Sequence, residues 1–179
     1  MASTKTWESA QFPAILTAPR EHDAIERLRR YFDGSKFTGA SFERLGGGGD
    51  RPDVANLVTA DDLVALSMLS VPVGGFVARE LLLRPTAQQV SDLLSVIPRG
   101  ASIETEEGRQ LLADRDGAAW QLWWLLRRAS KAAPPEMQRS QAFGPVRTSK
   151  LLARKRPHLF PIYDSVVAGG QVRWGGVRG

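Results

Sequence analysis

Residues 144–167, GPVRTSKLLARKRPHLFPIYDSVV, carry the clearest local signals of structure in this chain. Gly144 suits a non-helical cap, and Pro145 suits the first helical position, where its missing N–H is not needed. The helix that starts here has to end just before Pro157, because proline disfavours a helical residue in front of it. A second proline follows soon after, and a helix does not continue across both. The stretch therefore predicts a helix over 145–155 followed by an extended crossing.

The predicted helix is strongly basic, with five Lys and Arg between positions 147 and 156. Arg147, Lys150 and Arg154 are spaced i, i+3 and i+7, so they share one helical face. The first-turn amides point out of the helix N-terminus with partial positive charge, which makes this end a natural seat for a phosphate. Arg147 and Lys150 lie closest to it. We therefore expect contacts that hold a nucleic-acid backbone without reading its sequence.

Asp164 is the one acidic residue of the stretch. Leu159, Phe160 and Ile162 are expected to anchor the crossing that leads to it. As a cap of a following helix, Asp164 would contribute about 1 kcal/mol. As a functional group, it would be a carboxylate held near the phosphate seat. Both interpretations stay open, and capping is the simpler one.

Charge is unevenly distributed along the chain, whose net charge is +5. Residues 1–119 hold 13 Lys and Arg and 17 Asp and Glu, whereas residues 120–179 hold 11 Lys and Arg and 2 acidic residues. A basic third on an acidic body favours a polyanionic partner. A solvated basic surface would give the same composition.

The rest of the chain repeats apolar residues at helical spacing and lacks the alternation of strands. Thr59, with Asp62 three positions on, predicts a capping box at one helix start. Thr86 is expected to cap another helix. These patterns predict an all-α fold. Helices are expected within 21–32, 59–71, 84–98, 102–117 and 118–135.

Two segments suggest a binding role that their context disfavours. The four glycines of 46–49 resemble a phosphate loop, but no Gly-Lys-Ser/Thr follows and no apolar strand precedes them. We expect a flexible connector there. Trp120, Trp123 and Trp124 could stack on bases, but their place among leucines favours burial in the core.

The composition also excludes several kinds of site. The chain has no cysteine, and His22 and His158 each lack a second ligand at helical spacing. We therefore expect no metal and no cofactor. The first residues lack the apolar run of a secretory signal. Because Pro72 interrupts the longest uncharged stretch, residues 63–78, we also expect no membrane span and a cytoplasmic location.

The basic stretch resembles the helix-hairpin-helix element of the endonuclease III-like DNA glycosylases. Gly144 matches the last glycine of the hairpin, and Phe143 takes its apolar position. Thr148 and Ser149 match the small residues of the helix start, and Asp164 matches the catalytic aspartate. The resemblance covers about 25 residues. It implies DNA binding and a place in DNA repair, with Asp164 as the catalytic carboxylate.

This sequence departs from the hairpin pattern in several places. The first hairpin glycine would be Ala142, and the preceding Leu-Pro pair would be Ser140-Gln141. The lysine of bifunctional members would fall at Val146, so the resemblance does not imply lyase chemistry through that lysine. The glycine-rich end, AGGQVRWGGVRG (168–179), is expected to be disordered, or the product of a truncation or frameshift.

A closer resemblance is to an uncharacterised family of hypothetical proteins, chiefly from actinobacteria and their mobile elements. Its members carry a similar GPV-TSKLLARKRP-L-P-YDSVV block. The likeness extends over most of residues 20–167 and implies no known activity.

Together these observations predict an all-α protein with a single compact helical domain over 20–167. It would hold a helix-hairpin-helix-like element at 138–167 and follow an irregular arm at 1–19. The expected function is non-specific DNA binding. The alternatives are a monofunctional DNA N-glycosylase-like enzyme that uses Asp164, and a non-enzymatic structural or interaction protein. The expected DNA contacts are Phe143, Gly144, Arg147, Thr148, Lys150 and Arg154.

Overall fold

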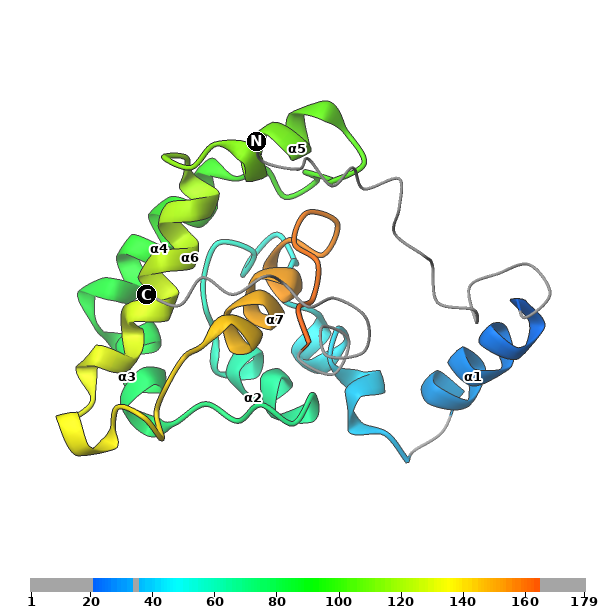
Figure 1. The fold of residues 1–179 in the computed structure, drawn as a ribbon, viewed down its shortest axis with the longest axis horizontal. Helices are drawn as coiled ribbons and strands as arrows, with labels where there is room; N and C mark the ends of the chain where they lie inside the picture. Colours follow the sequence, from blue (N-terminus) through cyan, green and yellow to red (C-terminus); the bar gives the residue numbers. More distant parts are fainter. Residues whose placement is uncertain (1–20, 34–35, 165–179) are drawn as a thin grey trace, which may run out of the picture. The chain divides into compact units, whose positions relative to one another are not determined.

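The computed structural model describes residues 21–33 and 36–164. These residues form helices joined by loops, with no strand among them (Figure 1). The predicted all-α class is confirmed. None of the described helices is long and apolar enough to cross a membrane. The α-helices are α1 (Glu21–Asp33), α2 (Ala60–Met68), α3 (Gly75–Leu83), α4 (Pro85–Val96), α5 (Glu106–Ala113), α6 (Ala118–Arg128) and α7 (Pro145–Lys155). Short 3-10 helices are η4 (Thr38–Ser41), η5 (Leu45–Gly47), η6 (Ala129–Ala132) and η7 (Pro135–Met137).

The chain forms two compact units, residues 1–40 and 41–179. This boundary lies inside the predicted 20–167 domain. In the first unit, α1 carries Tyr31, whose ring stacks on Phe37 with the centroids 5.5 Å apart. The second unit contains the basic helix α7 and the hydrophobic core.

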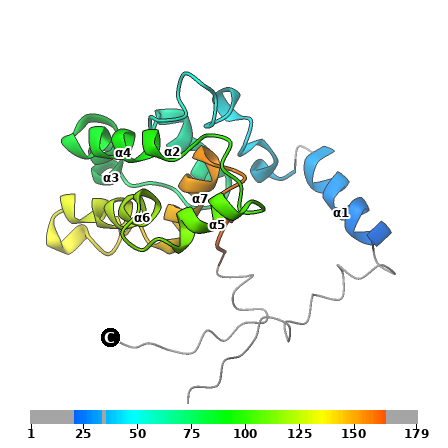
Figure 2. The same cartoon turned by 90° about the horizontal axis from the view of Figure 1, so that it is seen from above.

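The basic helix α7 lies at the centre of the second unit, packed against α2 and α6 (Figures 1 and 2). Every residue from 148 to 156 is buried. Burial of a whole helical stretch with four cations is unusual, because a buried charge needs a partner. The predicted bounds of this helix are confirmed, with Gly144 as its N-cap and Pro145 as its first residue.

A second group of helices packs on α6. Helix α4 lies against α3 and α6, and α5 packs on α6. Their apolar faces meet in one core, which is the main source of stability in a helical domain. Fully buried members of this core are Leu66, Val77, Leu81, Leu94, Leu122, Leu126, Leu151, Leu152 and Leu159.

Local chemistry sets the starts of two helices. The capping box of α2 is confirmed: the Asp62 amide donates to Thr59 Oγ1 at 3.3 Å, and the Thr59 amide donates to Asp62 Oδ2 at 2.8 Å. The expectation that Thr86 caps α4 is wrong. Arg84 is the N-cap and Pro85 the first residue, because proline has no N–H to satisfy and is preorganised for that position.

The loop with four glycines is not the flexible connector expected from sequence. Gly46, Gly47 and Gly48 have φ values of 60°, 81° and 98°, a region that glycine enters without the steric cost of a Cβ. Gly49 lies against α7, and a Cβ there would come within 2.6 Å of Arg154 Cγ. The glycines let the loop turn and approach the helix closely.

The predicted burial of the tryptophans is wrong for Trp124, whose residue surface is 46% exposed. Trp123 is half-buried and packs against the core, and Trp120 is half-buried. Leu122 and Leu126, on the inner face of α6, fill the core instead. Helical geometry places Trp120 and Trp124 four positions apart on one face, so both escape the interior.

Candidate functional site

The start of α7 is open. Gly144 has φ −75° and ψ −176°, and no side chain caps the helix. A Cβ built on Gly144 would meet no atom within 4 Å. The fold therefore does not require glycine at this position for space or for backbone angle. Because Gly144 has no side chain, the helix N-terminus is unobstructed there, and amides of the first turn can bind an anion.

The crossing after α7 lies back along this helix, held by two contacts. The Tyr163 amide donates to Ser149 Oγ at 3.0 Å. Lys150 Nζ donates to Asp164 Oδ2 at 3.1 Å, with side-chain exposures of 5% and 32%. These contacts place the Asp164 carboxylate beside the first two turns of α7. Its expected role as the cap of a following helix concerns residues 165–179, which lie outside the described part of the chain.

A pocket of about 350 Å³ lies between the first turns of α7, the crossing and α6. Next to it is an apolar pocket of about 190 Å³ that shares two of its wall residues, Trp123 and Phe160. The crossing is anchored as expected by Leu159 and Phe160, but Ile162 is 45% exposed and anchors nothing. Lining the larger pocket are Trp123, Pro145, Ser149, Phe160, Pro161 and Tyr163.

Two of the three expected phosphate contacts are near this helix start, but both are engaged. Arg147 Nε donates to the Pro72 carbonyl at 2.9 Å, and another of its nitrogens donates to the Ala142 carbonyl. Lys150 is buried and donates to the Leu69 carbonyl at 3.3 Å as well as to Asp164. Arg147 is half-buried, so it still reaches the surface.

Arg154, the third expected phosphate contact, lies near the other end of α7. It is 3% exposed, and its Nε donates to Asp62 Oδ1 at 2.8 Å while a terminal nitrogen donates to the Phe42 carbonyl. The helix thus directs its three aligned cations to separate internal partners, because most of its circumference is covered by protein. Of the other expected DNA contacts, Phe143 and Thr148 are also buried. Among the expected residues, Gly144 and Arg147 are the two that reach solvent.

Lys155 and Arg156 are buried cations that sequence reasoning did not assign. Lys155 pairs with Asp62 and donates to the carbonyls of Gly49 and Val54 at 3.0 and 3.2 Å. Burial lowers the pKa of Lys155, an effect that the Asp62 carboxylate opposes. The signal was present in the sequence, since three consecutive cations at 154–156 cannot all lie on the outer face of one helix.

Arg156 is fully buried and binds backbone carbonyls. Its Nε donates to the Ile97 carbonyl at 2.9 Å, and its terminal nitrogens donate to the carbonyls of Ala55 and Leu94 at 2.8 and 2.6 Å. Burial also lowers the pKa of Arg156. Guanidinium has five N–H donors in a rigid fork, which suits it to gather several carbonyls. These two cations stabilise the loops around α7, and neither is available to a ligand.

The internal use of these cations changes the charge argument. Of the 11 Lys and Arg in residues 120–179, Lys150, Arg154, Lys155 and Arg156 are buried. The described surface of residues 120–164 therefore carries fewer positive charges than the sequence of this segment suggests. In residues 21–33 and 36–164 no group of His, Cys, Asp and Glu could hold a metal ion.

Comparison with known proteins places the chain in a family. A family model described as a family of unknown function, DUF6308, matches residues 24–177. The chain belongs to this family. No match was found among curated proteins or among solved structures. The DUF6308 membership confirms the expectation of an uncharacterised family. The helix-hairpin-helix likeness and the actinobacterial origin stay predictions.

Proposed function

We propose that this DUF6308 protein binds nucleic acid at the start of α7. A backbone phosphate would lie on the open N-terminus of the helix, and a flat base would enter the adjoining pocket. The observation that carries the proposal is the position of an uncapped, unobstructed helix start beside a pocket with aromatic walls.

The phosphate part of the proposal depends on backbone amides rather than on the buried cations. A helix N-terminus carries about half a positive charge, and its first amides have no helical acceptor. Gly144 lets a ligand approach them closely because it lacks a Cβ. Arg147 is in the first turn of the same helix and adds a positive charge. Contacts of this kind hold a nucleic acid without reading its sequence.

The base part depends on the pocket. Trp123, Phe160 and Tyr163 provide aromatic walls, and the volume of about 350 Å³ lies within the range of small-molecule sites. Stacking on aromatic side chains contributes about 1–3 kcal/mol per base. Stacking in the pocket would therefore offset the free energy that a base loses when it leaves its stack in the duplex.

The Lys150–Asp164 pair favours a second candidate, a monofunctional DNA N-glycosylase. Asp164 directly follows Tyr163, a wall residue of the pocket, and its side chain is 32% exposed. A carboxylate in this position would stabilise the positive charge that develops on the sugar as the base leaves, or activate water. Buried Lys150 would hold it in place through the ion pair.

A substitution at Gly144 tests the binding proposal. In Gly144→Asp, the new carboxylate can cap the free amides, so the folded state should be more stable by about 0.3 kcal/mol, because glycine is itself a tolerated N-cap. The same carboxylate would occupy the phosphate seat and repel the ligand. We expect unchanged or slightly higher folding stability together with at least tenfold weaker duplex binding in a gel-shift salt titration.

The matched control is Gly100→Asp, which adds the same charge at another glycine with no atom within 4 Å of its Cβ position. It should change binding little. Equal binding by the Gly144→Asp and Gly100→Asp proteins would overturn the proposal. No binding by the unmodified protein at about 50 mM salt, where phosphate contacts are strong, would instead support a structural or interaction role.

A further inference from the structure

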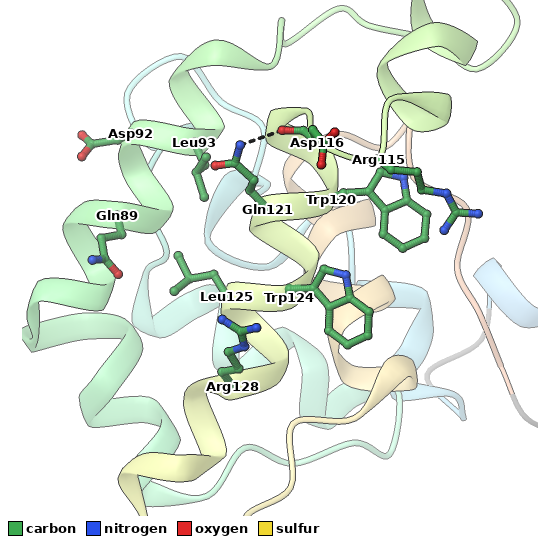
Figure 3. Close-up of a pocket in the computed structure, with 10 residues that line it drawn as sticks. All are labelled: Gln89, Asp92, Leu93, Arg115, Asp116, Trp120, Gln121, Trp124, Leu125 and Arg128. Carbon is green, nitrogen blue, oxygen red and sulfur yellow. Dashed lines mark hydrogen bonds between the residues drawn. The ribbon is translucent and has the colours of Figure 1, made fainter. Parts of the chain in front are cut away.

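A second and larger concavity is lined by residues of α4, of α6 and of the turn before α6. Its volume is about 820 Å³. Figure 3 shows Trp120 and Trp124 on the same side of α6, with Arg115 next to the first ring. We call this concavity the α4/α6 groove. It is lined by Gln89, Asp92, Leu93, Arg115, Asp116, Trp120, Gln121, Trp124, Leu125 and Arg128.

Each tryptophan of the groove is paired with an arginine. The guanidinium carbon of Arg115 lies 4.1 Å from the centroid of the Trp120 ring, and that of Arg127 lies 5.2 Å from the Trp124 ring. Trp120 Nε1 donates to the Leu112 carbonyl at 2.8 Å, which holds that ring in place. An arginine beside an indole face is oriented by the ring quadrupole.

The arginines at the groove, two in its lining and Arg127 beside Trp124, differ from the buried arginines of 154–156. Across the part of the chain that the structure describes, the side chains of Arg115, Arg127 and Arg128 form no hydrogen bond and no ion pair, whereas those of Arg154 and Arg156 are saturated by internal acceptors. Their N–H groups are therefore available for an external anion. A guanidinium fork suits a phosphate in particular.

The groove also continues towards the start of α7. Trp120 lines both the groove and the apolar pocket of about 190 Å³. Trp123 and Phe160 then line both that pocket and the pocket at the start of α7. Three neighbouring concavities thus share aromatic wall residues in series.

We infer that the α4/α6 groove binds single-stranded nucleic acid that runs on from the α7 site. Bases stack on the indoles of Trp120 and Trp124, and phosphates bind Arg115, Arg127 and Arg128. Alternation of aromatic faces and cations is how proteins bind single strands without sequence preference. The inference rests on the proposed function, since it extends the same bound molecule.

The two carboxylates of the groove limit where the phosphates can lie. Asp92 is on α4 and already accepts from Gln88 Nε2 at 2.8 Å. Asp116 lies in the turn before α6, next to Arg115. Both would repel a phosphate at close range. The strand is therefore expected to follow the α6 side, where Arg128 lines the groove and Arg127 lies next to Trp124.

The test compares a blunt DNA duplex with the same duplex carrying a single-stranded extension of about ten thymidines, at either end of the strand. A matching extension of uridines distinguishes RNA from DNA. Binding is measured by fluorescence anisotropy. We expect the extension to raise affinity about tenfold or more. The double variant Trp124→Leu with Arg127→Ala should remove this gain while leaving the affinity for the blunt duplex within about twofold.

Arg79→Ala is the matched control, because Arg79 lies 5.4 Å over the Phe76 ring outside the groove. It should keep the gain from the extension. If blunt and extended duplexes bind the unmodified protein equally, or if the double variant keeps the gain, the groove inference is overturned and the α7 site stands. Displacement by polyglutamate as effective as by oligothymidine would also overturn it. Absence of binding to every nucleic acid would overturn the proposed function itself.

Discussion

Asp62 and Arg154 are 92 positions apart in the chain and form a buried ion pair, with Arg154 Nε donating to Asp62 Oδ1 at 2.8 Å. Both side chains are 1% exposed. The same carboxylate accepts from the Thr59 amide at the start of α2 and pairs with Lys155. One aspartate thus joins the beginning of α2 to the end of α7 and balances part of the charge of two cations.

Removal of the Asp62 carboxylate should therefore be severely destabilising. Asp62→Ala leaves Arg154 and Lys155 buried without a counter-charge and deletes half of the capping box. Loss of one partner of a buried pair costs about 3–5 kcal/mol. Urea denaturation followed by circular dichroism measures the effect. Asp61→Ala, at the exposed neighbouring position, should stay within about 0.5 kcal/mol, and similar losses in both variants would contradict this role of Asp62.

Gly49 should tolerate no side chain. An added Cβ would lie 2.6 Å from Arg154 Cγ, 2.7 Å from Asp62 Oδ1 and 2.9 Å from the Arg154 carbonyl oxygen. Gly49→Ala should therefore lower the free energy of unfolding by about 1–3 kcal/mol, the usual cost of overpacking. Gly100→Ala, where the new methyl group meets nothing within 4 Å, serves as the comparison. Equal thermal midpoints for the two variants would show that the loop relaxes away from α7.

Lys155 should make the stability depend on pH in the alkaline range. Its pKa in the folded protein is lowered from 10.5, chiefly by burial. Between the lowered pKa and 10.5, the unfolded chain binds more protons than the folded protein, so the free energy of unfolding rises with pH. Below the lowered pKa the lysine is protonated in both states and adds no slope.

Comparison with Lys155→Met isolates this contribution. Denaturation of both proteins is measured between about pH 8 and pH 10. The free energy of unfolding of the unmodified protein minus that of the variant should increase across this range. A difference that decreases with pH would mean that the Asp62 carboxylate dominates and raises the pKa of Lys155.

Asp164→Asn separates catalysis from binding. The amide keeps the size of the side chain but loses the charge that would stabilise an oxocarbenium ion. If the protein is a glycosylase, base release from a lesion-containing duplex should fall at least 100-fold while gel-shift affinity stays within about threefold. Single-turnover cleavage assays after alkali treatment give the rate. Base release at an unchanged rate would remove Asp164 from the chemistry.

In the basic stretch, the features that could be predicted are those set by neighbouring residues. Proline and glycine act on the backbone of their own neighbourhood, so the bounds of α7, its Gly144 cap and the bend after it were predictable. The capping box of Thr59 and Asp62 is also a contact between near neighbours. The helical class followed from the same kind of local pattern.

The direction of each cation was decided only by the tertiary structure. Spacing placed Arg147, Lys150 and Arg154 on one face, but whether a face meets water or protein depends on residues that are distant in sequence. Here the chain from 42 to 62 encloses the end of α7 and supplies the carboxylate and the carbonyls that bind Arg154 and Lys155. A buried cation is stable only next to such acceptors, and here the acceptors lie about 100 positions away in the sequence, so packing brings them together.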